Sequence, residues 1–170
     1  LYTQFTSDGN TAIGYGAGYY SKTGGYSVYV GNQAGYGTVA NDNDYIVAIG
    51  YKSLFSMGAQ TDYNIGIGAF SLYSTSSGQY NVAIGHNALY SNTTAPHSTA
   101  IGFQALNNAT GGYNTAVGYA AGSSKTTGDS CTFIGRYTAS SGTHTGSGCT
   151  YVGDSAGQTS TSGNNLSLIH

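Results

Sequence analysis

Charged side chains are scarce in this chain. Only 6% of its 170 residues are charged, glutamate is absent, and the formal net charge is -2. Nucleic-acid binding requires a surface rich in Lys and Arg, and the whole chain has four such residues. No apolar run approaches the roughly 20 residues that a membrane-spanning helix needs. We therefore expect no nucleic-acid partner and no membrane insertion.

The chain also lacks a recognisable set of catalytic residues. It has no Glu, and its Asp residues fall in predicted turns or outside the predicted strands. The segment Gly14-Tyr15-Gly16-Ala17-Gly18 is similar to a phosphate-binding glycine loop, but no predicted helix follows it. The sequence therefore predicts a protein that is not an enzyme and uses no cofactor.

Tryptophan is absent and proline occurs once, whereas glycine occurs 28 times and tyrosine 17 times. A glycine-rich chain can be disordered, but disordered chains are poor in aromatic and β-branched residues. Tyrosine recurs along this sequence, and so does an Ile or Val. This composition favours a folded chain.

A five-residue block with the pattern x-(Thr/Val)-x-(Ile/Val)-Gly recurs ten times, for example at residues 10–14, 81–85 and 98–102. Successive blocks lie 16 to 19 residues apart, and a fixed period of this size is typical of solenoids. The sequence therefore predicts an all-β fold, a parallel β-solenoid or β-roll of about ten coils that forms a single domain over residues 1–170. The closing slots of the blocks are Gly14, Gly31, Gly50, Gly68, Gly85, Gly102, Gly118, Gly135, Gly153 and His170.

We number the block so that its glycine is position 5. Positions 2 and 4 carry mostly β-branched residues, which favour a strand. Side chains at these two positions lie on one face of a strand, and we expect that face to line the core. The predicted core column at position 4 is Ile13, Val30, Ile49, Ile67, Ile84, Ile101, Val117, Ile134, Val152 and Ile169.

Other positions repeat in the same phase. The glycine is expected because the chain needs a positive φ there or because a neighbouring backbone approaches closely. Position 8 carries small residues that we expect to point inward, and position 9 alternates between Gly and Leu. Position 1 is rich in Asn and Ser, whose side chains can form hydrogen bonds along the stack.

Two aromatic columns flank the block. Stacked coils place equivalent residues about 4.8 Å apart, so we expect the rings to form ladders. The ladder before the block is Tyr26, Tyr45, Tyr63, Tyr80, His97 and Tyr113. The ladder after position 9 is Tyr19, Tyr36, Phe55, Tyr73 and Tyr90.

Three segments of the chain are similar to repeats of known families. They are residues 81–89, which read Asn-Val-Ala-Ile-Gly-His-Asn-Ala-Leu, residues 98–106 and residues 114–122. These segments resemble the Ser-Val-Ala-Ile-Gly head repeats of trimeric autotransporter adhesins. They are also similar to the Asn-Thr-Ala-Ile-Gly-Tyr-x-Ala-Leu repeats of phage-type tail fibres and surface proteins. The resemblance implies a parallel β-roll, often trimeric, that is exposed on a cell or a virion.

Cys131 and Cys149 occupy position 1 of consecutive coils. Their Cα atoms are therefore expected near the roughly 4.4 to 6.8 Å separation that a disulfide requires. A disulfide would join two coils and would suit an oxidising, extracellular setting. The alternative is a pair of buried thiols that continues the Asn/Ser column.

Metal binding has one candidate segment. Asp42 and Asp44 lie in the longest predicted turn, where their oxygens could bind a hard cation. The alternative is a turn stabilised by the same side chains without a metal. The four His residues lie in different phases of the repeat, and His97 is interpreted as a substitute for Tyr.

The function expected from these patterns is structural or adhesive, outside a cell. Terminal coils of a solenoid have unpaired strand edges, which favours assembly with copies of the same chain, as a head-to-tail filament or a homotrimer. The alternative is a receptor-binding or glycan-binding shaft that uses exposed Tyr and Asn. Ice binding needs a flat Thr array, and the Thr residues at position 2 are expected to point inward and alternate with Val.

Overall fold

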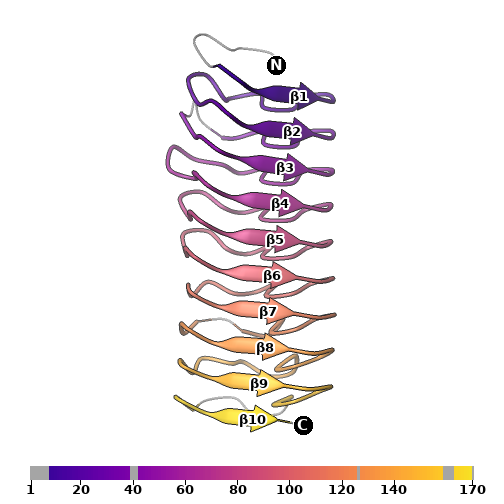
Figure 1. Cartoon of the computed structure of the whole chain (residues 1–170), viewed down its shortest axis with the longest axis vertical. Coiled ribbons are helices and arrows are strands. Elements are labelled where there is room, and N and C mark those ends of the chain that lie inside the picture. Colours follow the sequence, from indigo (N-terminus) through magenta and orange to yellow (C-terminus); the bar gives the residue numbers. More distant parts are fainter. Residues whose placement is uncertain (1–7, 39–41, 126, 159–162, 170) are drawn as a thin grey trace.

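The computed structural model describes residues 8–38, 42–125, 127–158 and 163–169. In those ranges the chain contains no helix and forms one ten-stranded parallel sheet, whose strands follow one another in chain order. Figure 1 shows the strands stacked above one another, with each coil returning behind them. The predicted parallel β-solenoid is confirmed. The strands are β1 (Thr11–Ile13), β2 (Val28–Val30), β3 (Val47–Ile49), β4 (Ile65–Ile67), β5 (Val82–Ile84), β6 (Thr99–Ile101), β7 (Thr115–Val117), β8 (Thr132–Ile134), β9 (Thr150–Val152) and β10 (Ser167–Ile169).

The strands pair in the register of the repeat. Val82 lies beside Thr99 and Ile84 beside Ile101, and every other neighbouring pair of strands has the same alignment of positions 2 to 4. The slot assigned to His170 lies outside the described residues. Each side chain therefore meets its equivalent in the next coil, so columns in the sequence become columns in space.

The strand face that lines the core is the opposite of the predicted one. The position-3 side chains of β2 to β9, including Ala83, Ala100 and Phe133, are buried, whereas Ile13 is 61% exposed and Ile134 43% exposed. The prediction of a position-4 core column is therefore wrong. Six of its residues are exposed, namely Ile13, Ile84, Ile101, Val117, Ile134 and Ile169. Four are half-buried, namely Val30, Ile49, Ile67 and Val152.

The narrow interior of the coil explains this reversal. A Cβ added to Gly66 at position 3 would lie 2.6 Å from the Ser53 Oγ atom, so little space remains beyond a small residue there. Side chains at position 8, such as Ala88, and leucines at position 9, such as Leu72 and Leu89, already fill the interior. All three of these residues are fully buried. Strand alternation has a period of two and does not itself say which face is inside.

Large residues at position 3 are matched by small residues at position 9. Tyr29 and Tyr151 each occupy a coil with glycine at position 9, and a Cβ on Gly35 or Gly157 would lie 2.1 or 2.2 Å from the respective ring. Where position 3 is Ala, as in Ala83, position 9 can be Leu. A ring at position 3 is thus always accompanied by Gly or Ala at position 9 in the described coils. Ala116 and Gly122 pair two small residues, and the side chains of Leu106 and Phe133 from the adjacent coils lie 2.9 Å from the place of a Cβ on Gly122.

The glycine that closes each block is required for both predicted reasons, a positive φ angle and the close approach of a neighbouring backbone. The φ angle of Gly85 is 138°, and a Cβ there would lie 2.3 Å from the carbonyl oxygen of Gly102 in the next coil. The other described closing glycines have φ angles between 119° and 138°. An L side chain rarely adopts such a backbone conformation, and its Cβ would also collide with the next coil.

The position-1 column forms the expected ladder of polar contacts. The Asn64 Oδ1 atom accepts a hydrogen bond from the Asn81 N–H at 2.8 Å, and Asn81 Oδ1 accepts from the Ser98 N–H at 2.9 Å. The side-chain amide of Asn81 donates to the Ala95 carbonyl at 3.0 Å. These buried side chains tie each strand to the next coil and to the opposite turn.

Candidate functional surface

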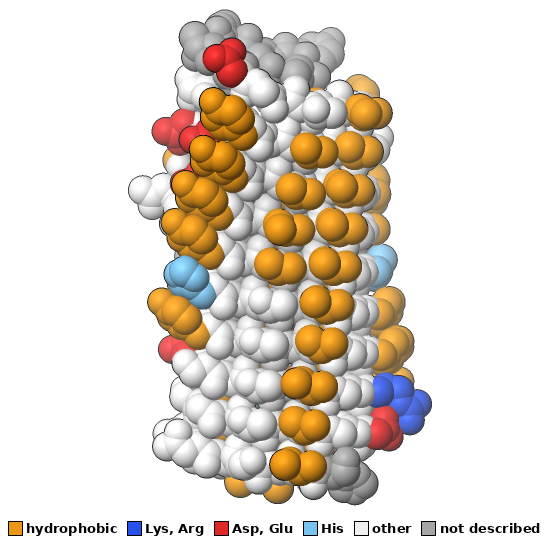
Figure 2. All heavy atoms as spheres, in the orientation of Figure 1, with side chains coloured by type: hydrophobic (Ala, Val, Ile, Leu, Met, Phe, Trp, Pro, Cys, Tyr) orange, Lys and Arg blue, Asp and Glu red, His pale blue; other side chains and the backbone are white. Residues whose placement is uncertain are grey.

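The outer face of the sheet consists of positions 2 and 4. Figure 2 shows one apolar column running the length of this face and a second that is confined to one half of it. The first is the Ile/Val column at position 4, and the second contains Val28, Val47, Ile65 and Val82 at position 2. No described residue at position 2 or 4 carries a charge.

The first aromatic ladder is confirmed. Tyr63 and Tyr80 stack with ring centroids 4.8 Å apart and planes inclined by 4°. His97 continues the ladder at 4.9 Å from Tyr80 and 5.1 Å from Tyr113, as expected for a substitute ring. The tyrosine edges remain about half exposed.

The second ladder is also confirmed. Its rings, Tyr19, Tyr36, Phe55, Tyr73 and Tyr90, follow one another with centroid separations between 4.9 and 5.3 Å. Burial raises the pKa of the Tyr36 hydroxyl.

A third aromatic column was not identified from the sequence. His86, Phe103 and Tyr119 at position 6 stack at 5.5 and 5.0 Å. The signal was present, because Tyr15 and Tyr51 share this phase, but Ala and Asn at the same position in other coils obscure it.

Ring stacking limits what the ladders can bind. The faces of the interior rings pack against each other, so a planar or sugar ligand meets ring edges and hydroxyls rather than open ring faces. The ladders are therefore regular rows of hydroxyl and C–H groups along the stack.

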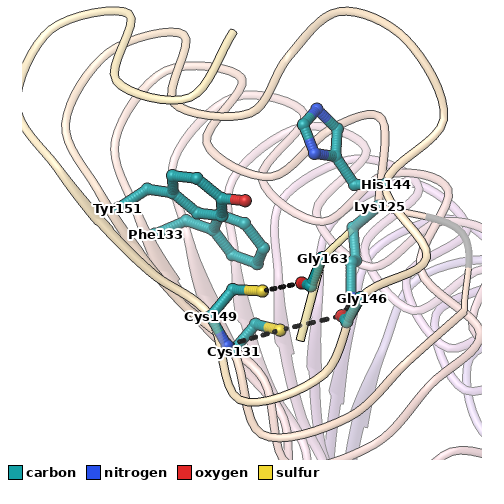
Figure 3. Close-up of a pocket in the computed structure, with 8 residues that line it drawn as sticks. All are labelled: Lys125, Cys131, Phe133, His144, Gly146, Cys149, Tyr151 and Gly163. Carbon is teal, nitrogen blue, oxygen red and sulfur yellow. Dashed lines mark hydrogen bonds between the residues drawn. The ribbon is translucent and has the colours of Figure 1, made fainter. Parts of the chain in front are cut away.

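The predicted disulfide between Cys131 and Cys149 does not form, and both residues are buried free thiols. Equivalent side chains on parallel strands point in the same direction, so each sulfur is directed across the coil (Figure 3). Cys131 Sγ donates to the Gly146 carbonyl at 3.2 Å, and Cys149 Sγ donates to the Gly163 carbonyl at 2.9 Å. Burial raises the pKa of the Cys131 thiol. The thiols continue the position-1 column.

Lys125 and His144 face the same interior space (Figure 3). Lys125 is 1% exposed, and its ammonium donates to the Gly146 carbonyl. His144 Nε2 lies 2.9 Å from the Ser141 carbonyl, and burial lowers the pKa of the ring. The space between these groups holds about one water molecule, which makes it too small for a substrate.

Asp44 stabilises a turn. Its Oδ1 atom accepts a hydrogen bond from the Gly25 N–H at 2.6 Å, while its own N–H donates to Asp62 Oδ1 at 3.0 Å. The structure does not bring Asp42 and Asp44 together with a further ligand, because the described residues contain no group of three or more His, Cys, Asp or Glu side chains that could hold a metal. The hydrogen bonds of Asp44 connect its turn to the turns of the two neighbouring coils.

The orientation of position 2 also bears on ice binding. Thr99, Thr115, Thr132 and Thr150 point outward, so the expectation that they point inward is wrong. In β2 to β5, however, position 2 carries valine or isoleucine, so the threonine array is still interrupted there.

No helix in the described part of the chain is long and apolar enough to cross a membrane. Comparison with protein-family models, curated proteins and solved structures finds no match to this chain. The fold and the surface together define a parallel β-solenoid repeat protein with stacked aromatic ladders and an uncharged, β-branched sheet face.

Proposed function

We propose that this chain is a non-enzymatic, extracellular structural or adhesive repeat protein that assembles into a filament or fibre through stacked β-coils. The observation that carries this proposal is the uniform stack, in which each described strand pairs with the next in chain order and in the same register. Within the described residues, β1 pairs with β2 alone and β10 with β9 alone. An unpaired parallel edge is a template for a further coil.

The interior of the stack supports an architectural role. Its buried side chains are packed against one another from coil to coil, and the cavity beside the cysteines is water-sized. The resemblance of the repeat to adhesin heads and tail fibres supports a location on a cell or virion surface.

Electron microscopy of the purified chain over a range of concentrations tests the assembly. We expect unbranched filaments, with an axial repeat of about 48 Å if ten coils of about 4.8 Å follow each other. Particles that stay one chain long at every concentration would contradict head-to-tail stacking.

A proline at the free edge gives a sharper test. In the neighbouring strands, the position-2 N–H donates to the next coil, as Thr132 does to Cys149 and Thr150 to Leu166. The Ser167 N–H on β10 is the equivalent donor on the open edge. Ser167→Pro is therefore expected to stop filament growth while leaving the pairing with β9 intact, and Ser167→Ala serves as the matched control.

A second candidate is receptor or glycan binding by the shaft of a trimeric adhesin or phage tail fibre. The half-exposed ladder of Tyr45, Tyr63 and Tyr80 favours it, because their hydroxyls line one side of the stack. A glycan array with wild type and Tyr63→Phe tests this function without requiring filaments. Loss of binding on removal of one hydroxyl is the expected result.

A further inference from the structure

Lys125 is the one buried side chain among the four Lys and Arg residues of the chain. It is 1% exposed, whereas Lys22, Lys52 and Arg136 reach the surface. In the described part of the chain, no carboxylate forms an ion pair with its ammonium. A buried ammonium without an anionic partner costs free energy, so a lysine at this place needs an explanation beyond packing.

Lys125 occupies a position of the repeat that is neutral in the other coils. It is position 12, and the other buried residues there are Ser21, Met57, Thr75, Asn92 and Ala109. Lysine is longer than each of these and reaches across the interior to the turn before β8. A Cβ on Gly128 in that turn would lie 2.6 Å from the Lys125 Nζ atom, so the glycine leaves room for the ammonium.

The ammonium of Lys125 and the thiol of Cys131 meet at one atom. Both donate to the carbonyl oxygen of Gly146, the thiol over a sulfur–oxygen distance of 3.2 Å, and Figure 3 shows both side chains directed at this residue. Burial raises the pKa of the Cys131 thiol, whereas the charge of Lys125 and a hydrogen bond from it lower that pKa. A nitrogen atom and a sulfur atom are thus held around a shared acceptor.

Backbone contacts fix both residues in this arrangement. The Lys125 N–H donates to the Gly122 carbonyl at 2.9 Å, and Lys125 forms a parallel β-bridge with His144 in the next coil. The Cys131 N–H donates to Asn114 Oδ1 at 2.9 Å. The water-sized cavity borders both side chains, so there is space for one further small atom beside them.

We propose that Lys125 and Cys131 form a modification site, at which dioxygen joins the lysine nitrogen to the cysteine sulfur through one bridging oxygen atom. The O–O bond of dioxygen breaks, and an N–O bond and an O–S bond form. The ammonium gives up two hydrogens and the thiol gives up one. Two of these leave with the second oxygen atom as water, and the third leaves as a proton. Nitrogen and sulfur lose two electrons each, and dioxygen gains all four.

The bridge suits this site for two reasons. It is uncharged, so its formation removes the unpaired charge from the interior. It also places one atom between nitrogen and sulfur, which disturbs a hydrogen-bonded pair less than a direct bond that draws the two atoms together. The free thiols described above are the reduced form of the site. The inference concerns the interior of one chain and does not depend on filament assembly.

Intact mass of the full chain tests the site. The chain is purified with reductant and without oxygen, and is then held in air-saturated buffer. We expect a gain of about 14 Da, from one oxygen gained and two hydrogens lost, which a thiol reductant reverses. The oxidised chain should take one alkyl label after unfolding, where the reduced chain takes two.

Variants assign the two bridged atoms. Lys125→Met copies the buried Met57 of the same column, and we expect it to lose the mass gain, as does Cys131→Ser. Cys149→Ser is the matched control, because its sulfur donates to Gly163 rather than to Gly146, and we expect it to keep the gain. In the unfolded wild type, trypsin should cleave after Lys22 whether or not the chain is oxidised, but after Lys125 only in the reduced chain.

Three outcomes would overturn the proposal. The first is an unchanged mass of the wild type in air. The second is a loss of about 2 Da that needs both cysteines, which indicates a disulfide. The third is a gain of about 16 Da that persists in Lys125→Met, which indicates a sulfenic acid on cysteine. The mass and the trypsin cleavage of the wild type decide the question even where a variant fails to fold.

Discussion

At the scale of single residues, the glycine that closes each coil has the least freedom. Its φ angle lies far from the range of other residues, and the next coil's carbonyl oxygen occupies the place of its side chain. The sequence predicted both reasons, because a residue that recurs at one position of a strand end is required by the backbone. Corner residues with positive φ that are not glycine, such as Leu89 at 51° and Tyr80 at 58°, could not be predicted in this way. Their side chains are retained for packing and outweigh the backbone cost.

Gly85→Ala tests the closing position. Its Cβ would lie 2.3 Å from the Gly102 carbonyl oxygen, and the φ angle is unfavourable for alanine. We expect the free energy of unfolding to fall by about 3 kcal/mol or more, measured by urea denaturation. Gly163→Ala is the control, since nothing lies within 4 Å of the added Cβ, and we expect a change below about 1 kcal/mol there.

Cys131 and Cys149 allow a direct chemical test. Because both thiols are free and buried, an alkylating reagent without reductant should add no label to the folded chain and two labels after unfolding. The raised pKa of the Cys131 thiol slows the reaction further, since the thiolate is the reactive form. Intact mass measures the outcome, and an unlabelled unfolded chain would indicate a disulfide instead.

His144 is expected to make stability depend on pH. Burial lowers its pKa in the folded chain below the ordinary value of 6.5. As the pH falls through about 6.5, the unfolded chain binds a proton that the folded chain does not, so the free energy of unfolding decreases until the folded pKa is reached. His144→Gln should reduce this loss, measured by denaturation at pH values above and below 6.5. An unchanged pH dependence in the variant would show that His144 is not responsible.

At the scale of the elements, each coil is a strand of three residues closed by turns, and its stability depends on how the interior is filled. The sequence predicted the strands, their register and the inward position-8 column, because these follow from a phase that all coils share. It did not predict which strand face is buried. In the sequence, alanine at position 3 does not indicate burial as clearly as the β-branched residues at positions 2 and 4 do. The interior nevertheless requires a residue of this small size.

The match between positions 3 and 9 can be tested by a double-mutant cycle in β5. Ala83→Phe alone overpacks the coil, and Leu89→Gly alone leaves a cavity, so we expect each to destabilise by about 1 to 4 kcal/mol. The double variant copies the pairing of a large ring with a small residue seen at Tyr151 and Gly157. We expect it to be more stable than the sum of the single effects by at least about 1 kcal/mol. Additive effects would refute the volume match.

At the scale of the whole molecule, the chain is a stack in which each coil contacts its neighbours along the axis. Hydrogen bonds between strands and between turns run from coil to coil, as do the aromatic ladders. Stability in such a stack approximates a sum over coils and their interfaces. No contact in this arrangement depends on the total number of coils.

Deletion of one full repeat should therefore preserve the fold. Removal of residues 82–98 joins Asn81 to Thr99 and keeps every column in phase, so we expect a folded chain with one strand fewer and a proportionally lower free energy of unfolding. Removal of residues 82–89 shifts the columns by half a coil and should abolish cooperative folding. Circular dichroism with thermal melting distinguishes the two deletions.

The sequence by itself determined the solenoid, its register, the closing glycines and the aromatic ladders. These features depend on the period and phase of the repeat, which the printed residues carry completely. Only the tertiary structure decided which side of the strands faces inward, the direction of the two thiols and the exposure of the divided position-2 column. The physical reason is that a period of two marks both strand faces equally, and the choice between them depends on the volume enclosed when the coil closes.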